Sequence, residues 1–229
     1  MTPVMERPSH TKRAPSLKHD ALLVIDDHPV ISEGFRRLAG KIGIAHVLEA
    51  GDIATGYAAF HNHRPQLVVT DLYFEDDGLS GLTLIRQMRA ANPASRILVF
   101  SETDDPVIVA HALKVGARGF ALKHAPIATL LEALATVQAG RGYLPHDIAT
   151  KIAMLDARDH VDPLGSLTAR ELQILSLIGR GKSNKDIVAI LPIKYRSLIS
   201  VMSTIRVKLG AESLVDLIQV AHSHIDVRT

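Results

Sequence analysis

The strongest constraint on the fold is an alternation of short apolar runs with longer amphipathic stretches, which begins at Ala21. Each run is apolar at consecutive positions and is bounded by polar or turn residues, as is typical of a strand buried on both faces. Strands that alternate with helices predict an α/β domain with a five-stranded, doubly wound parallel sheet. The five runs are ALLVID, AHVLEA, QLVVTD, RILVFS and GFALK.

The helices between these runs carry recognisable start and stop signals. In DDPVIVAHALKVGARG, Asp105 is placed as the N-cap, Pro106 as the first helical residue and Gly116 near the C-terminal end. The stretch PIATLLEALATVQAGRG supplies the last helix of this part of the chain. We therefore expect the first domain to span residues 21–142.

Strand signals cease after this point. Residues 143–163 are expected to form a linker with one short helix, and residues 164–229 a small all-α domain of four helices with apolar stripes at helical spacing. Two of these helices begin with capping boxes, Thr168 with Glu171 and Ser183 with Asp186. Residues 1–20, rich in Pro, Ser and scattered charges, are expected to be a disordered tail.

Composition excludes several classes of function. The chain has no cysteine, which rules out disulfides, thiolate metal sites and cysteine nucleophiles and suits a cytoplasmic protein. No apolar run approaches the ~20 residues needed to cross a bilayer, and the N-terminal segment lacks the apolar core of a secretory signal, so no membrane partner is expected. A formal net charge of +2 favours no particular partner.

Polar side chains follow the expected strands at the point where each strand ends. Asp26 and Asp27 follow the first run, Asp71 the third, Ser101 the fourth and Lys123 the fifth. In a doubly wound sheet, functional groups gather at the carboxyl ends of the strands. We therefore expect three carboxylates, a hydroxyl and an ammonium group at one edge of the sheet.

Such a cluster restricts the chemistry. Three carboxylates in one crevice repel one another unless a cation is present, and oxygen ligands with room for water suit Mg²⁺. A carboxylate there can act as a nucleophile toward a phosphoryl group, while the metal and the Lys neutralise the charge on the transferring oxygens. Taken singly, an Asp at a strand end is often only the N-cap of the next helix.

With these positions, the segment from Ala21 to Gly142 resembles a response-regulator receiver domain, and DDHPVISEGFRRL and KVGARGFALK resemble its NarL/FixJ branch. The resemblance implies a flavodoxin-like fold, a regulatory rather than an enzymatic protein, and phosphorylation of Asp71 by a sensor histidine kinase. It also implies Mg²⁺ held by Asp27, Asp71 and the Tyr73 carbonyl with help from Asp26, and a switch formed by Ser101, Phe120 and Lys123.

One departure lies close to Asp71. The family usually continues from this Asp as Asp-Leu-x-Met-Pro-x-x-x-Gly, whereas this chain has DLYFEDDGLSG, two residues longer and without the Pro. The acidic residues Glu75, Asp76 and Asp77 either repel an incoming phosphodonor or form a solvated loop, and the second interpretation is preferred because loops absorb insertions readily. Glu102, directly after Ser101, is a further candidate for restricting access.

From Leu167 onward the chain resembles a LuxR-type helix-turn-helix, with SNKDIVAIL as the scaffold helix and Tyr195 to Leu209 as the recognition helix. A recognition helix lies in the major groove of DNA. Leu198, Val201 or Met202, Ile205 and Leu209 are expected to face the core. The candidate DNA-binding residues are Lys182, Lys185, Arg196, Ile199, Ser200, Ser203, Arg206 and Lys208.

The middle of this helix departs from the family pattern, because Ile199 replaces the usual Lys. Bases at both ends can hold phosphates, serines can hydrogen-bond base edges, and Ile199 can lie against a thymine methyl group. The leading hypothesis is a phosphorylation-controlled transcription factor that binds double-stranded DNA as a homodimer. The alternative is a response regulator whose helical domain now mediates protein–protein contacts through Ile199 and its neighbours. A haloacid-dehalogenase-like phosphatase is disfavoured, since it would need DxD after the first strand.

Overall fold

The computed structural model describes residues 21–75, 77–157 and 163–224. The expected disordered tail, residues 1–20, lies outside the described residues, and so does Asp76 of the acidic insertion.

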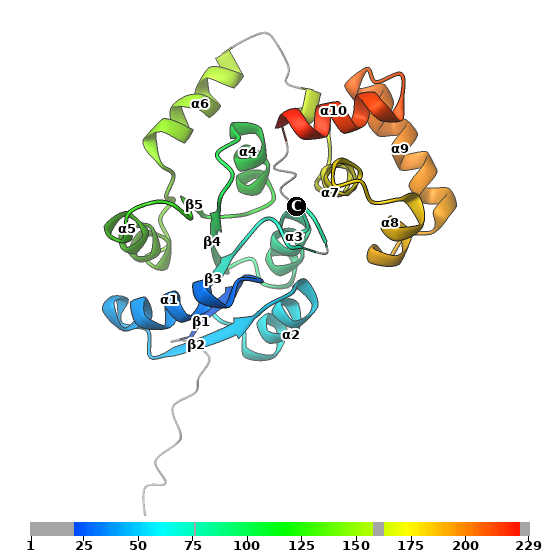
Figure 1. Cartoon of the computed structure of the whole chain (residues 1–229). Helices are drawn as coiled ribbons and strands as arrows, with labels where there is room; N and C mark the ends of the chain where they lie inside the picture. Colours follow the sequence, from blue (N-terminus) through cyan, green and yellow to red (C-terminus); the bar gives the residue numbers. More distant parts are fainter. Residues whose placement is uncertain (1–20, 76, 158–162, 225–229) are drawn as a thin grey trace, which may run out of the picture.

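The five apolar runs form a single parallel sheet, as predicted (Figure 1). The strand order is β2-β1-β3-β4-β5, so the order reverses between β1 and β3 and opens a crevice at the carboxyl ends of these strands. Almost all residues of the four strands other than β2 are buried, which explains their consecutive apolar positions. The strands are β1 Ala21–Ile25, β2 His46–Ala50, β3 Leu67–Thr70, β4 Arg96–Ser101 and β5 Gly119–Leu122.

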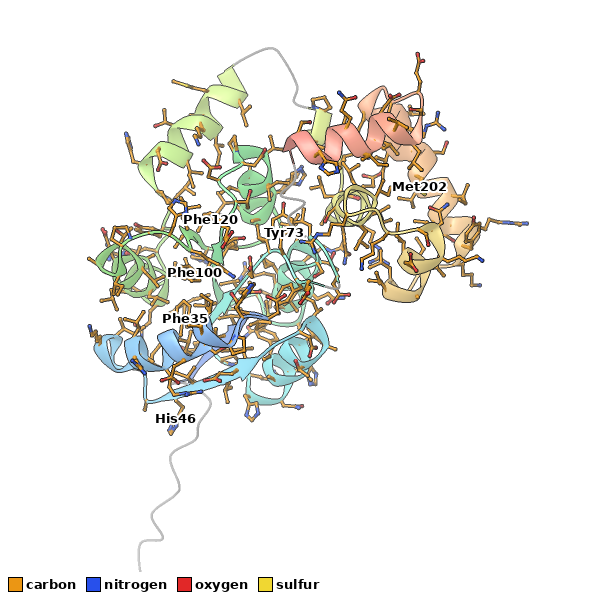
Figure 2. The ribbon with its side chains drawn as sticks, viewed as in Figure 1. Phe35, His46, Tyr73, Phe100, Phe120 and Met202 are labelled. Carbon is orange, nitrogen blue, oxygen red and sulfur yellow. The ribbon has the colours of Figure 1, made fainter. Side chains whose placement is uncertain are left out.

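Helices cover both faces of the sheet and complete the predicted flavodoxin-like fold. One hydrophobic cluster packs α1 and α5 against one face, and its rings Phe35 and Phe100 meet edge to face at 5.3 Å (Figure 2). The other face packs against α2, α3 and α4. The Asp105 carboxylate accepts hydrogen bonds from the Val107 and Ile108 amides and so caps α4, as expected. The helices are α1 Pro29–Ala39, α2 Ile53–His63, α3 Gly81–Ala91, α4 Pro106–Lys114 and α5 Ile127–Gln138, with a 3-10 turn η1 at Gly40–Ile42.

The C-terminal part is entirely helical among its described residues. Both predicted capping boxes are present, at Thr168 and at Ser183, and Gly210 ends the long helix with a left-handed φ of 64°. The segment expected to be a linker contains α6, which packs against α4. The elements are α6 His146–Ala157, η2 Pro163–Ser166, α7 Ala169–Gly179, α8 Asn184–Ile190, α9 Tyr195–Leu209 and α10 Leu214–His224.

Helix α7 lies between the two domains. It contacts α9 and α10 of its own domain and α3 of the sheet domain (Figure 1). Among the described residues, no single helix is long and apolar enough to cross a membrane, and α8 with α9 meets that description only as a pair bent by 111°.

Candidate functional site

Asp71 lies directly after β3, at the carboxyl edge of the sheet, and is only 5% exposed. One of its oxygens, Oδ1, accepts hydrogen bonds from the Ser101 hydroxyl and the Leu72 amide, both at 2.6 Å. The other oxygen, Oδ2, lies 2.7 Å from the Lys123 ammonium nitrogen. These contacts fix both oxygens of the carboxylate at the bottom of a hollow that opens to solvent.

Lys123 bridges two buried carboxylates. Its Nζ lies 2.7 Å from Asp26 Oδ2 as well as 2.7 Å from Asp71 Oδ2. Burial raises the pKa of the Asp71 carboxyl above its ordinary value, and the opposing effects of Lys123 and Ser101 do not cancel this rise. Burial also disfavours the Lys123 ammonium, but the charges of Asp71 and Asp26 outweigh it and the pKa of Lys123 lies above its ordinary value. The two shifts have different origins, since burial dominates at Asp71 and the neighbouring carboxylates dominate at Lys123.

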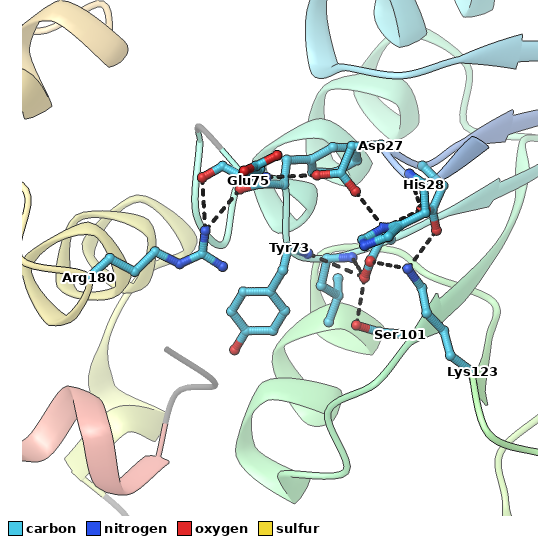
Figure 3. A network of polar contacts seen from close by, with 11 residues as sticks. Asp27, His28, Tyr73, Glu75, Ser101, Lys123 and Arg180 are labelled. Atoms are coloured by element: carbon cyan, nitrogen blue, oxygen red, sulfur yellow. Dashed lines mark hydrogen bonds and ion pairs between the residues drawn. The ribbon is translucent and has the colours of Figure 1, made fainter. Parts of the chain in front are cut away.

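Asp27 stands at the rim of the same hollow, as Figure 3 shows. Its Oδ1 lies 2.9 Å from His28 Nδ1, and its Oδ2 accepts a hydrogen bond of 2.8 Å from the Glu75 amide. His28 also donates its backbone amide to Asp26 at 2.9 Å. Asp27 thus joins the β1–α1 turn to the segment after β3.

The hollow has a volume of about 420 Å³. Lys123 pairs with Asp26 and Asp71, whereas Asp27 contacts only His28 and the Glu75 amide among the contacts described. The side chains that line the hollow include the carboxylates of Asp27, Asp71, Glu75 and Glu102 against the cationic groups of Lys123 and Arg180, so a divalent cation would balance the excess of carboxylates. Carboxylate oxygens beside an open, solvent-accessible space are the donors that Mg²⁺ prefers, because this ion keeps several water ligands. The residues present therefore fit Mg²⁺, with Asp26, Asp27, Asp71 and the Tyr73 carbonyl as the candidate holders.

The remaining switch candidate, Phe120, lies on β5 and is completely buried (Figure 2). The structure thus brings together Asp26, Asp27, Asp71, Ser101 and Lys123 at one edge of the sheet, with Phe120 in the core beneath. Glu102 is exposed and lines the hollow.

The acidic insertion does more than form a solvated loop. The side chain of Glu75 is exposed, but the backbone of this segment contacts the helical domain, and Arg180 from that domain lines the hollow. This position of Arg180 could not be predicted from the sequence, because a base after an amphipathic helix is typical of a solvent-facing C-terminal end.

In the helical domain, α9 presents the expected two faces. Leu198 and Ile205 are completely buried, while Val201, Met202 and Leu209 are half-buried. On the outer face, Ile199 is 43% exposed. The other candidates on α9, namely Arg196, Ser200, Ser203, Arg206 and Lys208, are also exposed. Of the two candidate bases beside α8, Lys185 is exposed and Lys182 is half-buried.

Two of the candidate DNA-binding bases are already engaged within the domain. Lys208 Nζ lies 2.8 Å from Glu171 Oε2 and donates to the Ser166 carbonyl at 3.1 Å, which ties α9 to α7. Arg206 donates to the backbone carbonyls of Ala211 and Glu212. Their contribution to a DNA contact stays a prediction.

Comparison with known proteins assigns both parts of the chain. Residues 22–135 match the response regulator receiver domain, and residues 165–221 match the bacterial regulatory proteins of the luxR family. The methanol utilization control regulatory protein MoxX of Paracoccus denitrificans is 34% identical over 86% of this chain and 88% of its own length. The oxygen regulatory protein NreC of Staphylococcus aureus is 30% identical over 87% of this chain and 95% of its own.

Among solved structures, the RcsB response regulator of Salmonella typhimurium superposes with a TM-score of 0.69 at 23% identity, over 91% of this chain and 99% of that chain. Another structure of RcsB holds two dimers bound to two parallel DNAs and superposes with a TM-score of 0.56 at 23% identity, over 90% of this chain and 98% of that one. At this identity the likeness shows the fold. The chain belongs to the two-component response regulators of the NarL/FixJ type, which join a receiver domain to a LuxR-type helix-turn-helix and regulate transcription.

Proposed function

We propose that this protein is a phosphorylation-controlled transcription regulator of the cytoplasm. A sensor histidine kinase supplies the phosphoryl group to Asp71, and a homodimer of the phosphorylated protein binds double-stranded DNA through α9. The observation that carries the proposal is the convergence of Asp26, Asp27, Asp71, Ser101 and Lys123 at the edge of a sheet that is joined to a helix-turn-helix.

The geometry supports a nucleophilic role for Asp71. An oxygen of its carboxylate would form a bond to phosphorus as the bond from phosphorus to the donor's leaving group breaks, and the leaving group would take the electron pair. Lys123 and Ser101 contact the two oxygens of the carboxylate, so each is in place to contact the product. When bound, Mg²⁺ would neutralise charge on the phosphoryl oxygens, held by Asp26, Asp27, Asp71 and the Tyr73 carbonyl.

The exposed outer face of α9 supports DNA as the partner. Arg196 is exposed near the start of α9, which supports a contact with a backbone phosphate, and the exposure of Ser200, Ser203 and Ile199 supports contacts with base edges. The same exposure of Ile199, an apolar residue where the family has a base, favours the second candidate function, a protein contact in place of DNA.

Two measurements test these proposals. With acetyl phosphate and Mg²⁺, the parent protein is expected to dimerise more strongly, whereas the Asp71→Asn protein should not respond. An equal response of both proteins in sedimentation would reject the switch at Asp71.

The partner is tested by fluorescence titration of labelled duplex DNA over a salt series. Binding with a steep salt dependence is expected for a protein that neutralises several phosphates. Absence of binding at the lowest salt concentration, for the phosphorylated protein as well, would reject DNA in favour of the protein partner.

A further inference from the structure

Helix α7 of the helical domain packs against α3 of the receiver, and polar contacts fix how the two are aligned (Figure 1). Gln173 on α7 meets the first turn of α3, where its Oε1 lies 3.4 Å from Thr83 Oγ1. One turn further along α7, Ser176 Oγ accepts a hydrogen bond of 3.1 Å from the Leu79 amide, which precedes α3. Later residues of α7 therefore meet earlier residues of the receiver, and the two segments run in opposite directions.

This alignment brings two arginines together. Arg86 lies one turn beyond Thr83 on α3, and Arg170 lies one turn before Gln173 on α7. Residues three apart share a face of a helix, so two antiparallel helices that match Thr83 with Gln173 also match Arg86 with Arg170. Arg170 Nη1 donates to Gln173 Oε1 at 3.0 Å, which is the oxygen that Thr83 approaches, so its guanidinium is held on the side of α3. We call Arg86 and Arg170 the arginine pair.

The protein does not balance the charge of the arginine pair. Within residues 21–75, 77–157 and 163–224, neither guanidinium forms an ion pair with a carboxylate. Glu171, the acid next to Arg170 in the sequence, is paired with Lys208 and accepts from the Thr168 amide. Burial lowers the pKa of Arg170 below its ordinary value, and the charge of Arg86 lowers it further. Burial and a neighbour of like charge thus both disfavour the guanidinium of Arg170.

The N-terminus of α7 adds positive potential at the same place. Thr168 is the N-cap of this helix of 11 residues, so Arg170 belongs to its first turn. The amide groups of a first turn carry a partial positive charge, which favours acidic side chains there and disfavours basic ones. A basic side chain in this position, beside a second arginine, is therefore unfavourable for the protein alone, and a bound anion would remove the cost.

We propose that Arg86 and Arg170 form a binding site for a small phosphate-bearing dianion at the junction of the two domains. A guanidinium donates hydrogen bonds in a planar fork that matches the oxygens of a phosphate group, so two of them can hold one phosphate from two sides. Arg86 is exposed and Arg170 is half-buried, which lets a ligand reach the pair from solvent. Each domain supplies one guanidinium, so the site is incomplete in either domain alone.

The charge of the pair favours a small phosphate compound over the backbone of DNA. A phosphodiester carries one negative charge, whereas a terminal phosphate group carries close to two and matches two guanidinium groups. A ligand that binds both arginines also favours the arrangement in which the receiver and the helical domain hold them together. None of the residues that contact the Asp71 side chain belongs to the pair, so this inference does not rest on the proposed phosphorylation.

Calorimetric titration of the full chain with pyrophosphate, without divalent ions and at low ionic strength, tests the site. Arg86→Gln should weaken binding about tenfold, the effect of losing one hydrogen-bonded charge, and Arg170→Gln should weaken it by a similar factor. Arg86→Lys keeps the charge but loses the fork, so its affinity should fall less, by about threefold. The matched controls are Arg141→Gln on the receiver and Lys194→Gln on the helical domain, which remove exposed charges elsewhere and should leave the affinity unchanged.

A charge reversal tests whether the two arginines are neighbours without any ligand. In Arg86→Glu the new carboxylate meets Arg170 and takes the place of the anion, so pyrophosphate binding should be lost. Without pyrophosphate, Arg86→Glu should unfold at a higher temperature than the parent. The difference should narrow as pyrophosphate is added, because the ligand stabilises only the parent.

Three results would overturn the site. They are no heat of binding for the parent at millimolar pyrophosphate, equal affinities for the parent and the variants of the arginine pair, and an equal loss for Arg141→Gln. Because Arg86 is exposed, its substitution should leave the fold intact, and circular dichroism of each variant checks this. If pyrophosphate affinity is unchanged while Arg86→Gln lowers the slope of log DNA affinity against log salt by about 0.9, the pair contacts a DNA phosphate and the small ligand is rejected.

Discussion

The acidic hollow and the outer face of α9 are built in opposite ways. In the hollow, Asp71 and Lys123 are buried and each side chain is held by neighbours from two or more strand ends. On α9, Arg196 and Ile199 project from one helix into solvent. The residues of a site that several strand ends assemble depend on one another's positions. Residues on an exposed helix face, in contrast, can be substituted one at a time without disturbing the fold.

The two halves of the chain depart from their family patterns at different kinds of position. The receiver keeps every candidate phosphorylation residue, and its departures lie in the loop after Asp71. The helical domain keeps its core residues Leu198 and Ile205, and its departures lie on the outer face. The following substitutions test this contrast, beginning with the largest expected effect.

Lys123→Met should be the most damaging change, because it leaves Asp26 and Asp71 buried without their ammonium partner. We expect a loss of about 3 kcal/mol in the free energy of unfolding at neutral pH, in the range for breaking a buried ion pair. Mg²⁺ should restore part of this loss, since the cation replaces the missing positive charge. Urea unfolding with and without Mg²⁺ measures both effects.

The control is Lys114→Met on the exposed surface of α4. A substitution within the same fold but away from the hollow should change stability by no more than about 0.5 kcal/mol. Similar losses for the two variants, or a loss for Lys123→Met that Mg²⁺ does not alter, would show that the carboxylates are not gathered around a cation.

On α9, Arg196→Ala should leave folding intact and weaken DNA binding about tenfold on every sequence, as expected for a phosphate contact. The slope of log affinity against log salt should fall by about 0.9, corresponding to one phosphate. Titration of labelled duplex at several salt concentrations measures both, with Arg141→Ala as the charge-matched control. An unchanged salt slope would exclude Arg196 from the DNA contact and favour the protein-binding alternative.

Lys208→Gln tests whether this base holds α9 in place. Loss of its ion pair with Glu171 and its bond to Ser166 should cost about 1 kcal/mol of folding stability. Chemical unfolding at neutral pH measures it, with the exposed Lys185→Gln as control. If Lys208 instead serves only DNA, the two variants will unfold alike and differ in DNA affinity alone.

The same pair predicts a pH dependence. Burial disfavours the charged Glu171, but the hydrogen bonds from Lys208 and Thr168 prevail and hold the pKa of this carboxyl below its ordinary value of 4.5. A carboxyl whose pKa is lower in the folded state stabilises the fold above its ordinary pKa and loses this contribution as the pH falls through the lowered value. The stability of the parent should therefore fall more steeply below pH 4.5 than that of Lys208→Gln.

The sequence was sufficient to predict the sheet, the capping boxes and the convergence of Asp71, Ser101 and Lys123. These features follow from local patterns, because apolar runs set the strands and parallel strands end at one edge. The metal role of the cluster and the DNA contacts of α9 stay predictions, since they depend on partners outside the chain.

The docking of α7 could not be predicted from the sequence. Gln173, Ser176 and Arg180 have the spacing of the solvent-facing side of an amphipathic helix, and nothing local distinguishes a polar face that meets water from one that meets a loop. Their partners lie about a hundred residues earlier in the chain, and they are mostly backbone atoms, which leave no mark on side-chain chemistry. Only the unusual length of the segment after Asp71 indicated that something differed there.

The smallest expected effect concerns Ile199, where the contrast between held and exposed residues is sharpest. Because this side chain is 43% exposed, Ile199→Ala should change folding stability by less than about 0.5 kcal/mol. If the side chain lies against a thymine methyl group, affinity should fall about threefold on the preferred sequence and stay unchanged on one lacking that thymine. Val207→Ala, a branched residue on the same helix that is 80% exposed, is the matched control. Equal affinities for parent, Ile199→Ala and Val207→Ala on all sequences would remove Ile199 from the DNA contact and leave a protein partner as the reason for an apolar residue at the centre of this helix.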